Sequence, residues 1–270
     1  MERIKLIRDS FQNFKTYGLP KAQLVIADIP YQLGANAYGS NPSWYIDGDN
    51  KNGESEKAHQ SFFHTDNKSA FGINEFFLFC RNMLAKGKGK GKGEPCMLIF
   101  CAFEQQFELI QEAKKWGFNH YINLVFRKNF SAQVLKANMR IVGNCEYGLL
   151  FYRDKLPKFN NQGRMIFNCM DYPRDNETPK VHPTQKPVAL LEKIIRLFTD
   201  VDDVVIDPVA GSGTTLLAAA NCGRKAYGFE IVKEFYNGFY EKIYPCINVD
   251  LFAQSELNKK EEKRLLFEVK

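Results

Sequence analysis

The sequence predicts an α/β fold, with a mostly parallel sheet wound on both faces by helices. Short buried apolar runs that end in turn residues alternate along the chain with longer stretches carrying a helical apolar stripe. One of these runs leads through a glycine-rich turn into a helical stretch. The 270 residues, 44% of them hydrophobic, are enough for one large α/β domain with a real core. Alternation of this kind is typical of a doubly wound parallel sheet.

The first half of the chain supplies two buried strands, two helices and a long polar stretch. KAQLVIADIP predicts a strand that ends at Asp28, and CMLIFCAF (96–103) predicts a second one. Residues 73–85 and 104–118 have helical patterns. Residues 32–70 are polar and rich in Gly, Asn and Ser, and loops of this length in compact domains are usually functional or disordered.

The second half completes the alternation. Its expected elements are strands at 119–128 and 145–153, an irregular stretch at 154–181, a helix at 186–200, a strand ending at Asp207, a helix after the glycine turn and a strand at 225–231. We see no internal repeats. We therefore expect one domain over residues 1–250, with loop inserts at 32–70 and 154–181 that contact a partner. Residues 251–270 should form a charged tail or helix.

Charge and cysteine content limit the class of protein. The net charge of +6 fits a polyanionic partner such as nucleic acid, although many basic proteins bind none. Seven scattered cysteines without a CxxC pair argue against a disulfide framework and a structural zinc site, and we expect no metal. The charged N-terminus does not resemble a secretory signal, and no apolar stretch approaches the roughly 20 residues that span a bilayer. We therefore expect a cytoplasmic protein.

The glycine turn VVIDPVAGSGTT predicts a ligand site. It places Asp207 at a strand end and Gly211 and Gly213 before a helix, where glycines let the backbone approach a ligand closely. The next strand ends in Glu230, a carboxylate suited to a ribose diol. A dinucleotide fingerprint would require Gly or Ala at the position of Leu216, so a pyrophosphate is disfavoured and a zwitterionic, cationic ligand is favoured. A purely structural turn is the alternative.

A second strand end carries the residues DIPY. In an open α/β sheet ligands bind outside the carboxyl ends of the strands, so Asp28 and Asp207 should face the same side. Asp28 and the carbonyl of Ile29 can accept both hydrogens of an exocyclic amine. Pro30 holds that carbonyl in an extended geometry, and Tyr31 offers a face for stacking on a base. The alternative is a polar turn that merely closes the strand.

These motifs resemble those of the amino-methyltransferases. DIPY is similar to their (D/N/S)PPY motif, DPVAGSGTT to their S-adenosylmethionine loop, and HPTQKP (182–187) to a third motif. The catalytic motif comes first and the cofactor loop last, as in the β-class DNA amino-methyltransferases, and the resemblance covers roughly residues 1–245. It implies a Rossmann-like S-adenosylmethionine-dependent methyltransferase fold, circularly permuted.

The resemblance also implies site residues. The catalytic set is Asp28, Ile29, Pro30 and Tyr31, and the cofactor set is Asp9, His182, Thr184, Gln185, Lys186, Asp207, Gly211, Ser212, Gly213, Thr214 and Glu230. Tyr38, Trp44, Arg127 and Lys128 are candidates for contacts with DNA. Two positions depart from the family pattern: Ile29 replaces a proline whose backbone carbonyl is used, and Val209 replaces a phenylalanine of the cofactor loop.

The implied function is site-specific DNA adenine-N6 methylation, with the target base flipped out of the duplex. Asp28 resembles the adenine-modifying members more than the cytosine-N4 members. A cytosine-N4 methyltransferase, a catalytically impaired DNA-binding protein that holds the cofactor, and a methyltransferase of RNA or protein stay open. The implied partner is DNA, in a restriction–modification setting, and a homodimer is left open.

Overall fold

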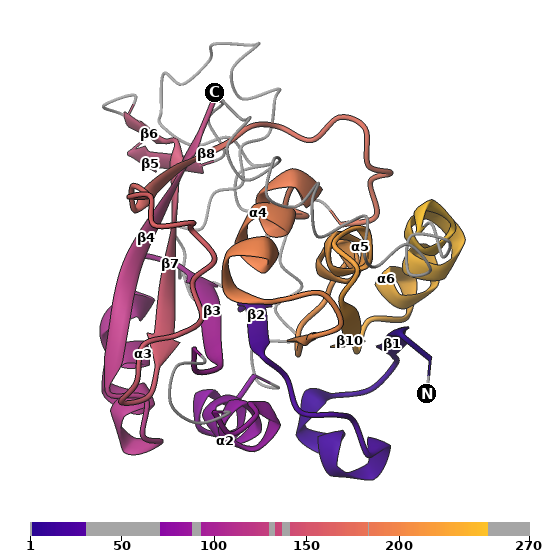
Figure 1. Cartoon of the computed structure of the whole chain (residues 1–270). Helices are drawn as coiled ribbons and strands as arrows, with labels where there is room; N and C mark the ends of the chain where they lie inside the picture. The colour runs from indigo at the N-terminus through magenta and orange to yellow at the C-terminus, as the bar shows by residue number, and fades with distance from the viewer. Residues whose placement is uncertain are drawn as a thin grey trace.

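The computed structural model describes residues 2–30, 71–87, 93–129, 133–136, 141–182 and 184–247, and they form an α/β fold (Figure 1). The main sheet has eight strands in the order β1-β10-β9-β2-β3-β7-β4-β8. Their bounds are β1 Ile4–Ile7, β2 Leu24–Asp28, β3 Cys96–Cys101, β4 His120–Lys128, β7 Cys145–Tyr152, β8 Cys169–Tyr172, β9 Val204–Asp207 and β10 Lys225–Phe229. Strands β5 (Gln133–Lys136) and β6 (Ile141–Gly143) form a separate antiparallel pair.

The helices lie between these strands in the chain or follow the last of them, β10. Within the described ranges, the α-helices are α2 (Ile73–Met83), α3 (Gln105–Lys115), α4 (Val188–Phe198), α5 (Thr214–Asn221) and α6 (Lys233–Gly238). Further helical segments of the described residues are η1 (Phe11–Tyr17), η6 (Phe239–Ile243) and η7 (Tyr244–Cys246). None of the helices in the described ranges is long and apolar enough to cross a membrane.

The sheet is mostly parallel, as the sequence predicts. Only β7 runs against its neighbours, pairing antiparallel with β3 and with β4. The two central strands are β2 and β9, which pair in parallel through Leu24 and Val205. From β2 the chain winds outward through β3, and from β9 it winds the other way through β10. The winding therefore reverses between β9 and β2, and in open α/β sheets ligands bind beyond the carboxyl ends at such a point.

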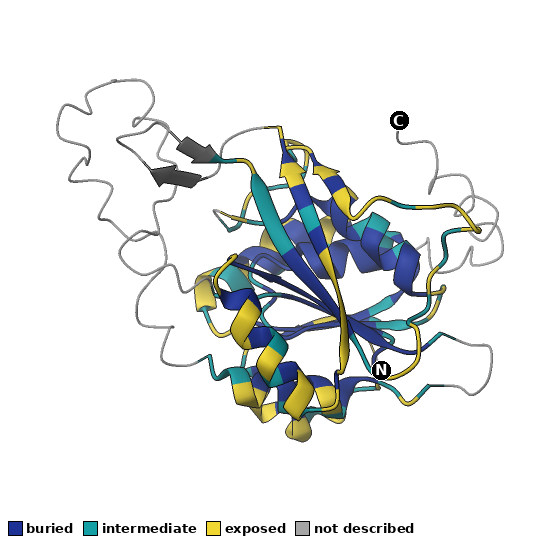
Figure 2. Cartoon of the chain, turned by 90° about the vertical axis from the view of Figure 1, so that its left-hand side faces the viewer, coloured by how far each residue is buried: buried dark blue, intermediate teal, exposed yellow. Residues whose placement is uncertain are grey.

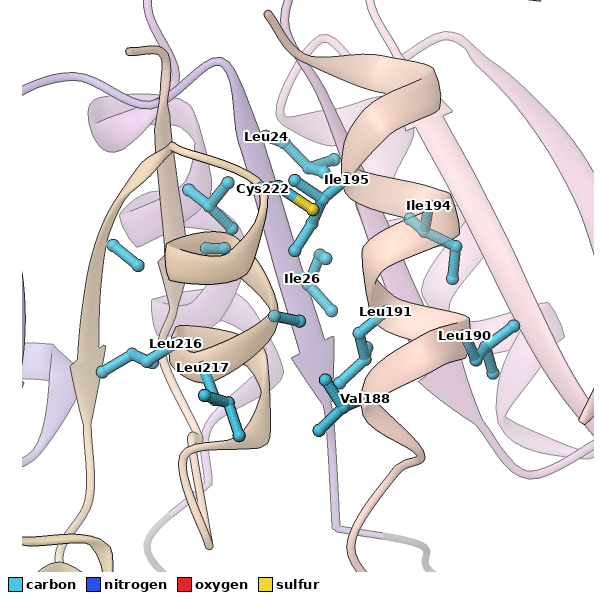
Figure 3. Packing of buried hydrophobic residues seen from close by; sticks show 14 of the residues in the cluster. Leu24, Ile26, Val188, Leu190, Leu191, Ile194, Ile195, Leu216, Leu217 and Cys222 are labelled. Carbon is cyan, nitrogen blue, oxygen red and sulfur yellow. The ribbon is translucent and has the colours of Figure 1, made fainter. Parts of the chain in front are cut away.

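Helices cover both faces of the sheet and bury alternate residues of its central strands. Helices α4 and α5 pack on one face, where Leu24 and Ile26 of β2 meet the leucines and isoleucines of α4 (Figure 3). On the other face Val25 and Ala27 of β2 pack with residues of η1, α2 and α3. The period-two alternation of side chains along a strand explains why LVIAD is apolar throughout. Figure 2 shows the sheet interior buried and the outer surface of α3 exposed.

The sequence prediction missed several short elements. Strand β1 has four residues, and β8 has four within the stretch 154–181 that we expected to be irregular. Both are edge strands with one partner each, so neither shows the long apolar run of a central strand. The pair β5–β6 and the helix η1 were not expected either. The predicted insert 32–70 and tail 251–270 lie outside the described residues, as do Tyr31, Tyr38 and Trp44.

Candidate active site

Four acidic residues line the carboxyl edge of four neighbouring strands. Asp28 ends β2 and Asp207 ends β9, while Glu230 directly follows β10 and Asp9 lies two residues beyond β1. These strands are parallel, so their carboxyl ends share one edge of the sheet. The two predicted strand-end motifs are therefore side by side, at the point where the winding reverses.

The turn after Asp28 is anchored to the neighbouring strand and to α3. The backbone amide of Ile29 donates to the carbonyl of Phe100 at 3.3 Å, and the Ile29 side chain is buried. The Gln105 side chain donates through Nε2 to the Pro30 carbonyl at 3.0 Å and accepts from the Ala102 amide through Oε1 at 2.9 Å. Gln105 thus bridges the two turns that follow β2 and β3. Sequence reasoning missed Gln105, because its contact with the Pro30 carbonyl exists only once β2 and β3 are neighbours.

The glycine turn has the backbone geometry that its sequence predicts. Gly211 and Gly213 have φ of +53° and +78°, a region that favours glycine. The Gly211 amide donates to Glu230 Oε2 at 2.8 Å, and the Val209 amide donates to Asp207 Oδ1 at 3.0 Å. The two carboxylates therefore shape the loop from both sides. Ser212 and Thr214, the other predicted members, are buried within it.

Asp207 and Glu230 are buried carboxyl groups whose pKa values are raised. Burial raises the pKa of Asp207 to about 7, helped by the nearby charges of Asp28 and Glu230 and opposed by hydrogen bonds from Thr215 and the Val209 amide. Burial likewise raises the pKa of Glu230 to about 7. A positively charged ligand would favour the ionised form of both. These two carboxylates therefore fit the cationic ligand that the sequence favours better than they fit a pyrophosphate.

Asp9 lies at the far end of this row. Its carboxylate accepts hydrogen bonds from the Tyr17 hydroxyl at 2.6 Å, from Asn13 Nδ2 at 2.8 Å and from the Ser10 amide at 2.7 Å. The hydrogen bonds of Tyr17 and Asn13 lower the pKa of Asp9. The side chain is thus held in place as an ionised acceptor at the end of β1.

The segment from His182 to Lys186 touches both motifs. The His182 ring stacks edge-on against Phe235 with centroids 4.4 Å apart, and a Cβ built on Gly211 would lie 3.8 Å from that ring. Burial lowers the pKa of His182 to about 4, aided by the positive charges of Lys186 and Lys180, so its imidazole is neutral. His182 therefore packs beside the glycine turn.

The other members of this segment hold its shape or reach the turn at Asp28. Gln185 accepts from the Val181 amide at 3.0 Å and donates to the Pro179 carbonyl at 3.2 Å, and Thr184 donates its backbone amide to His182 Nδ1 at 3.2 Å. Lys186 is different, because its Nζ lies 2.6 Å from Asp28 Oδ2. The resemblance implies that Lys186 contacts the cofactor, and in the structure its ammonium contacts the carboxylate of Asp28.

Lys128 and Arg127 end β4 and face different surroundings. Lys128 is buried, and its Nζ contacts Glu146 Oε1. Arg127 is exposed, with its guanidinium 2.7 Å from Asp171 Oδ1 on the adjacent strand β8. Lys128 is therefore directed into the protein, and of this pair only Arg127 lies at the surface. Sequence reasoning missed Glu146, because β7 runs antiparallel and brings its first residues to the carboxyl edge.

The comparison with protein families gives one match over most of the chain. Residues 22–241 match the N6/N4 methyltransferase family, described as DNA methylase. Among curated proteins, the DNA adenine methyltransferase YhdJ of Escherichia coli is 34% identical over 136 residues, which cover 49% of this chain and 42% of YhdJ. The putative methylase YubD of Escherichia coli is 27% identical over 147 residues, which cover 54% of this chain and 61% of YubD. The chain thus matches only part of the length of these relatives.

Solved structures of methyltransferases share the fold. The M1.HpyAVI–SAM complex is similar with a TM-score of 0.61 at 21% identity, covering 89% of this chain and 98% of that one. The cytosine-N4-specific PvuII DNA methyltransferase has a TM-score of 0.62 at 15% identity, covering 98% of this chain and 93% of that one. At these identities the likeness concerns the fold, which agrees with the prediction of a methyltransferase fold.

Proposed function

The chain belongs to the N6/N4 DNA methylase family, and we propose that it transfers the methyl group of S-adenosylmethionine to the N6 amine of adenine in DNA. One observation carries the proposal: the turn at Asp28 and the glycine turn at Asp207–Gly213 lie side by side where the winding of the sheet reverses. Adenine, rather than cytosine, is supported by Asp28 and by the partial similarity to YhdJ, whose name specifies adenine.

The cofactor half of the site comprises the residues around the glycine turn. Asp207, Glu230, Gly211 and Gly213 would hold S-adenosylmethionine, with His182 packed beside the turn. When bound, this cofactor supplies a methyl group on a positively charged sulfur. Glu230 would accept hydrogen bonds from the ribose diol, and the positive charge of the ligand would stabilise the ionised form of both buried carboxylates. Asp9 is an anchored acceptor for the far end of the same ligand.

The base-binding half comprises the turn after β2. Asp28 and the Ile29 carbonyl would accept the two hydrogens of the exocyclic amine, and this turns its lone pair toward the methyl group. A carboxylate offers roughly four lone-pair sites, so the Lys186 contact at Oδ2 leaves Asp28 able to accept a further hydrogen bond. The nitrogen loses one proton on methylation, and Asp28 is the acceptor already beside it. Extrusion of the base costs a few kcal/mol, which stacking on Tyr31 would offset in part.

DNA contacts are proposed from the surface next to this edge. Arg127 is exposed there. Its guanidinium could leave Asp171 and bind a DNA phosphate, and its positive charge would then stay paired. Tyr38 and Trp44 are candidates from the 32–70 stretch. Lys128 is better explained by its buried contact with Glu146 than by a contact with phosphate.

The direct test is to incubate the protein with unmethylated DNA and S-adenosylmethionine labelled in the methyl group, and then to identify the labelled nucleoside. Labelled N6-methyl-2′-deoxyadenosine is the expected product, and Asp28→Ala should abolish it while leaving cofactor binding intact. Label in N4-methylcytosine would overturn the choice of base but keep the reaction type. Cofactor binding without any transfer to DNA or RNA would instead indicate a protein that has lost catalysis.

A further inference from the structure

Four side chains of alternating charge form a chain that ends at Asp28. Lys128 Nζ contacts Glu146 Oε1, Lys186 Nζ lies 3.2 Å from Glu146 Oε2, and the same Nζ lies 2.6 Å from Asp28 Oδ2. The four residues come from β4, β7, the segment before α4 and the end of β2. Two lysines and two carboxylates therefore alternate along the carboxyl edge of the sheet.

This row of four charged side chains is buried at the Lys128 end and more exposed at the Asp28 end. The side chains of Lys128, Glu146 and Lys186 are 8%, 13% and 6% exposed, whereas that of Asp28 is 30% exposed. The Lys186 ammonium also lies 4.9 Å from the centre of the Phe100 ring, and Lys128 lies 5.1 Å from that of Tyr172. Asp28, the terminal member, is thus the most exposed of the four side chains.

A row of buried charges of this kind is not expected to contribute much to the stability of the fold. Buried ion pairs often contribute no more than apolar residues of the same volume, because desolvation offsets their attraction. Burial raises the pKa of Glu146, yet the attraction of Lys186 and Lys128 outweighs it and lowers the pKa below its ordinary value. Glu146 is therefore a carboxylate held between two ammonium groups.

We propose that Glu146, anchored by Lys128, is a positioning residue that holds the Lys186 ammonium against Asp28 and thereby fixes the direction in which Asp28 accepts a hydrogen bond from the substrate amine. The inference rests on the proposed function, in which Asp28 contacts that amine. It gives Lys186 and Lys128 a role at the base-binding half of the site, away from the cofactor and from phosphate.

The physical reason lies in the length of the lysine stem. A lysine has four rotatable methylenes, and one carboxylate alone does not fix where its ammonium lies. Glu146 and Asp28 together hold Lys186 Nζ from two sides, so neither Lys186 nor Asp28 can turn independently. Since a misplacement of about 1 Å can cost about 100-fold in rate, loss of Glu146 should slow the chemical step.

The test is Glu146→Gln, which keeps the shape and removes the charge. We expect kcat for methyl transfer to fall at least tenfold, while KM for DNA and the affinity for S-adenosylmethionine change less than twofold. The matched control is Glu192→Gln, which breaks the pair between Glu192 and Arg196 within α4, 3.1 Å apart and distant from the acidic edge. This control should keep the wild-type kcat.

A double-mutant cycle shows whether Glu146 acts through Lys186. In a Lys186→Gln background, Glu146→Gln should cause little further loss, because the ammonium it holds is already gone. Equal losses in both backgrounds would overturn the proposal, and so would a wild-type kcat for Glu146→Gln. If Glu146→Gln fails to fold, Glu146→Asp keeps the charge and shortens the stem, and it should lose kcat without a lower melting temperature.

The outcomes also separate this inference from the proposed function. Wild-type protein that methylates DNA, together with an unaffected Glu146→Gln variant, would refute the positioning role alone. Wild-type protein that binds S-adenosylmethionine and modifies no nucleic acid would refute the proposed function, and the positioning role with it.

Discussion

At the scale of single residues, the acidic groups of the site differ in what compensates their charge. Asp28 is paired with Lys186, whereas Asp207 and Glu230 are held by amide and hydroxyl donors. The first arrangement suits a group that accepts a hydrogen bond from a neutral amine. The second suits groups that receive a cation, because their raised pKa values return toward normal when positive charge arrives.

The Gln105 side chain gives a prediction about the turn that follows β2. Gln105→Ala removes the donor to the Pro30 carbonyl and the acceptor for the Ala102 amide. An unsatisfied buried group costs about 1–3 kcal/mol, so a turn that relaxes should lower kcat by about tenfold. Steady-state methylation kinetics measure this effect.

Gln106→Ala is the matched control for Gln105→Ala. Gln106 is the next residue and is similarly buried, and within the described part of the chain its Nε2 has no hydrogen-bond partner. We expect this variant to retain kcat. Equal losses in the two variants would mean that packing of α3, and not the bond to Pro30, sets the rate.

Cofactor affinity should depend on pH through Asp207 and Glu230. With both pKa values near 7, the carboxylates are largely protonated at pH 6 and ionised at pH 8, and a cation binds the ionised form. Affinity for S-adenosylmethionine should therefore rise with pH, by about tenfold per carboxylate over this range. The stability of the ligand-free protein depends on pH in the opposite direction. Between about pH 4 and 7 the folded state binds more protons at these two groups than the unfolded state does, so the free energy of unfolding falls as the pH rises.

Calorimetric titration of wild type and Asp207→Asn tests this pH dependence. The ligand's own amino group titrates alike in both experiments, so the difference between the two slopes isolates Asp207. The variant should show the shallower slope. Parallel slopes would contradict the role given to Asp207.

Residue-level prediction from sequence succeeded where position along one strand was sufficient. Asp28, Asp207 and Glu230 could be placed because each follows its own apolar run. Gln105 and Glu146 could not be placed. Their contacts depend on which strands become neighbours, and that information is absent from the local pattern.

At the scale of secondary-structure elements, the turn between β9 and α5 must pack tightly on η6. The φ of Gly213 is +78°, and a Cβ built there would lie 2.2 Å from Cδ2 of the Phe239 ring. An L side chain would therefore be strained and would also displace the ring. This close approach explains why the loop needs glycine at that position beyond any need of the ligand.

Gly213→Ala should destabilise the protein more than strain alone does. The matched control is Gly117→Ala, where φ is +83° but nothing lies within 4 Å of the new Cβ. The unfavourable φ destabilises both variants, and overpacking against Phe239 destabilises Gly213→Ala by about 1–3 kcal/mol more. Chemical denaturation should show this difference in the free energy of unfolding. Equal destabilisation would mean that the Phe239 ring moves aside freely.

The sequence predicted the long central elements to within a few residues at each end. We expected a helix at 186–200 and find α4 at Val188–Phe198, and we expected a strand at 225–231 and find β10 at Lys225–Phe229. The misses, β1 and β8, are short edge strands whose pairing is created by the finished sheet. The start of α4 lies at Val188 and not at 186, because Pro187 has a non-helical ψ of 133° and is the N-cap of the helix.

At the scale of the whole molecule, the order of strands brings distant parts of the chain to one edge. Asp28 and Lys186 are 158 residues apart in sequence and in contact in space. The sequence allowed the prediction that two strand-end motifs share an edge, because parallel strands align their carboxyl ends. It did not reveal that β7 runs antiparallel and so delivers Glu146, from its beginning, to that edge.

Binding of the cofactor should raise the stability of the whole domain. The glycine turn joins β9 to α5 at the centre of the sheet, so a ligand bound there stabilises the core that the helices share. At 100 times its dissociation constant, S-adenosylmethionine should add about 2.7 kcal/mol of stability. For a protein of this size that corresponds to a rise in melting temperature of about 5–10 °C in a thermal-shift measurement.

NAD at the same concentration should leave the melting temperature unchanged, because Leu216 occupies the position where a pyrophosphate turn needs a small residue and two buried carboxylates repel phosphate. A comparable rise with NAD, or no rise with S-adenosylmethionine, would show that the glycine turn is not the cofactor site proposed above.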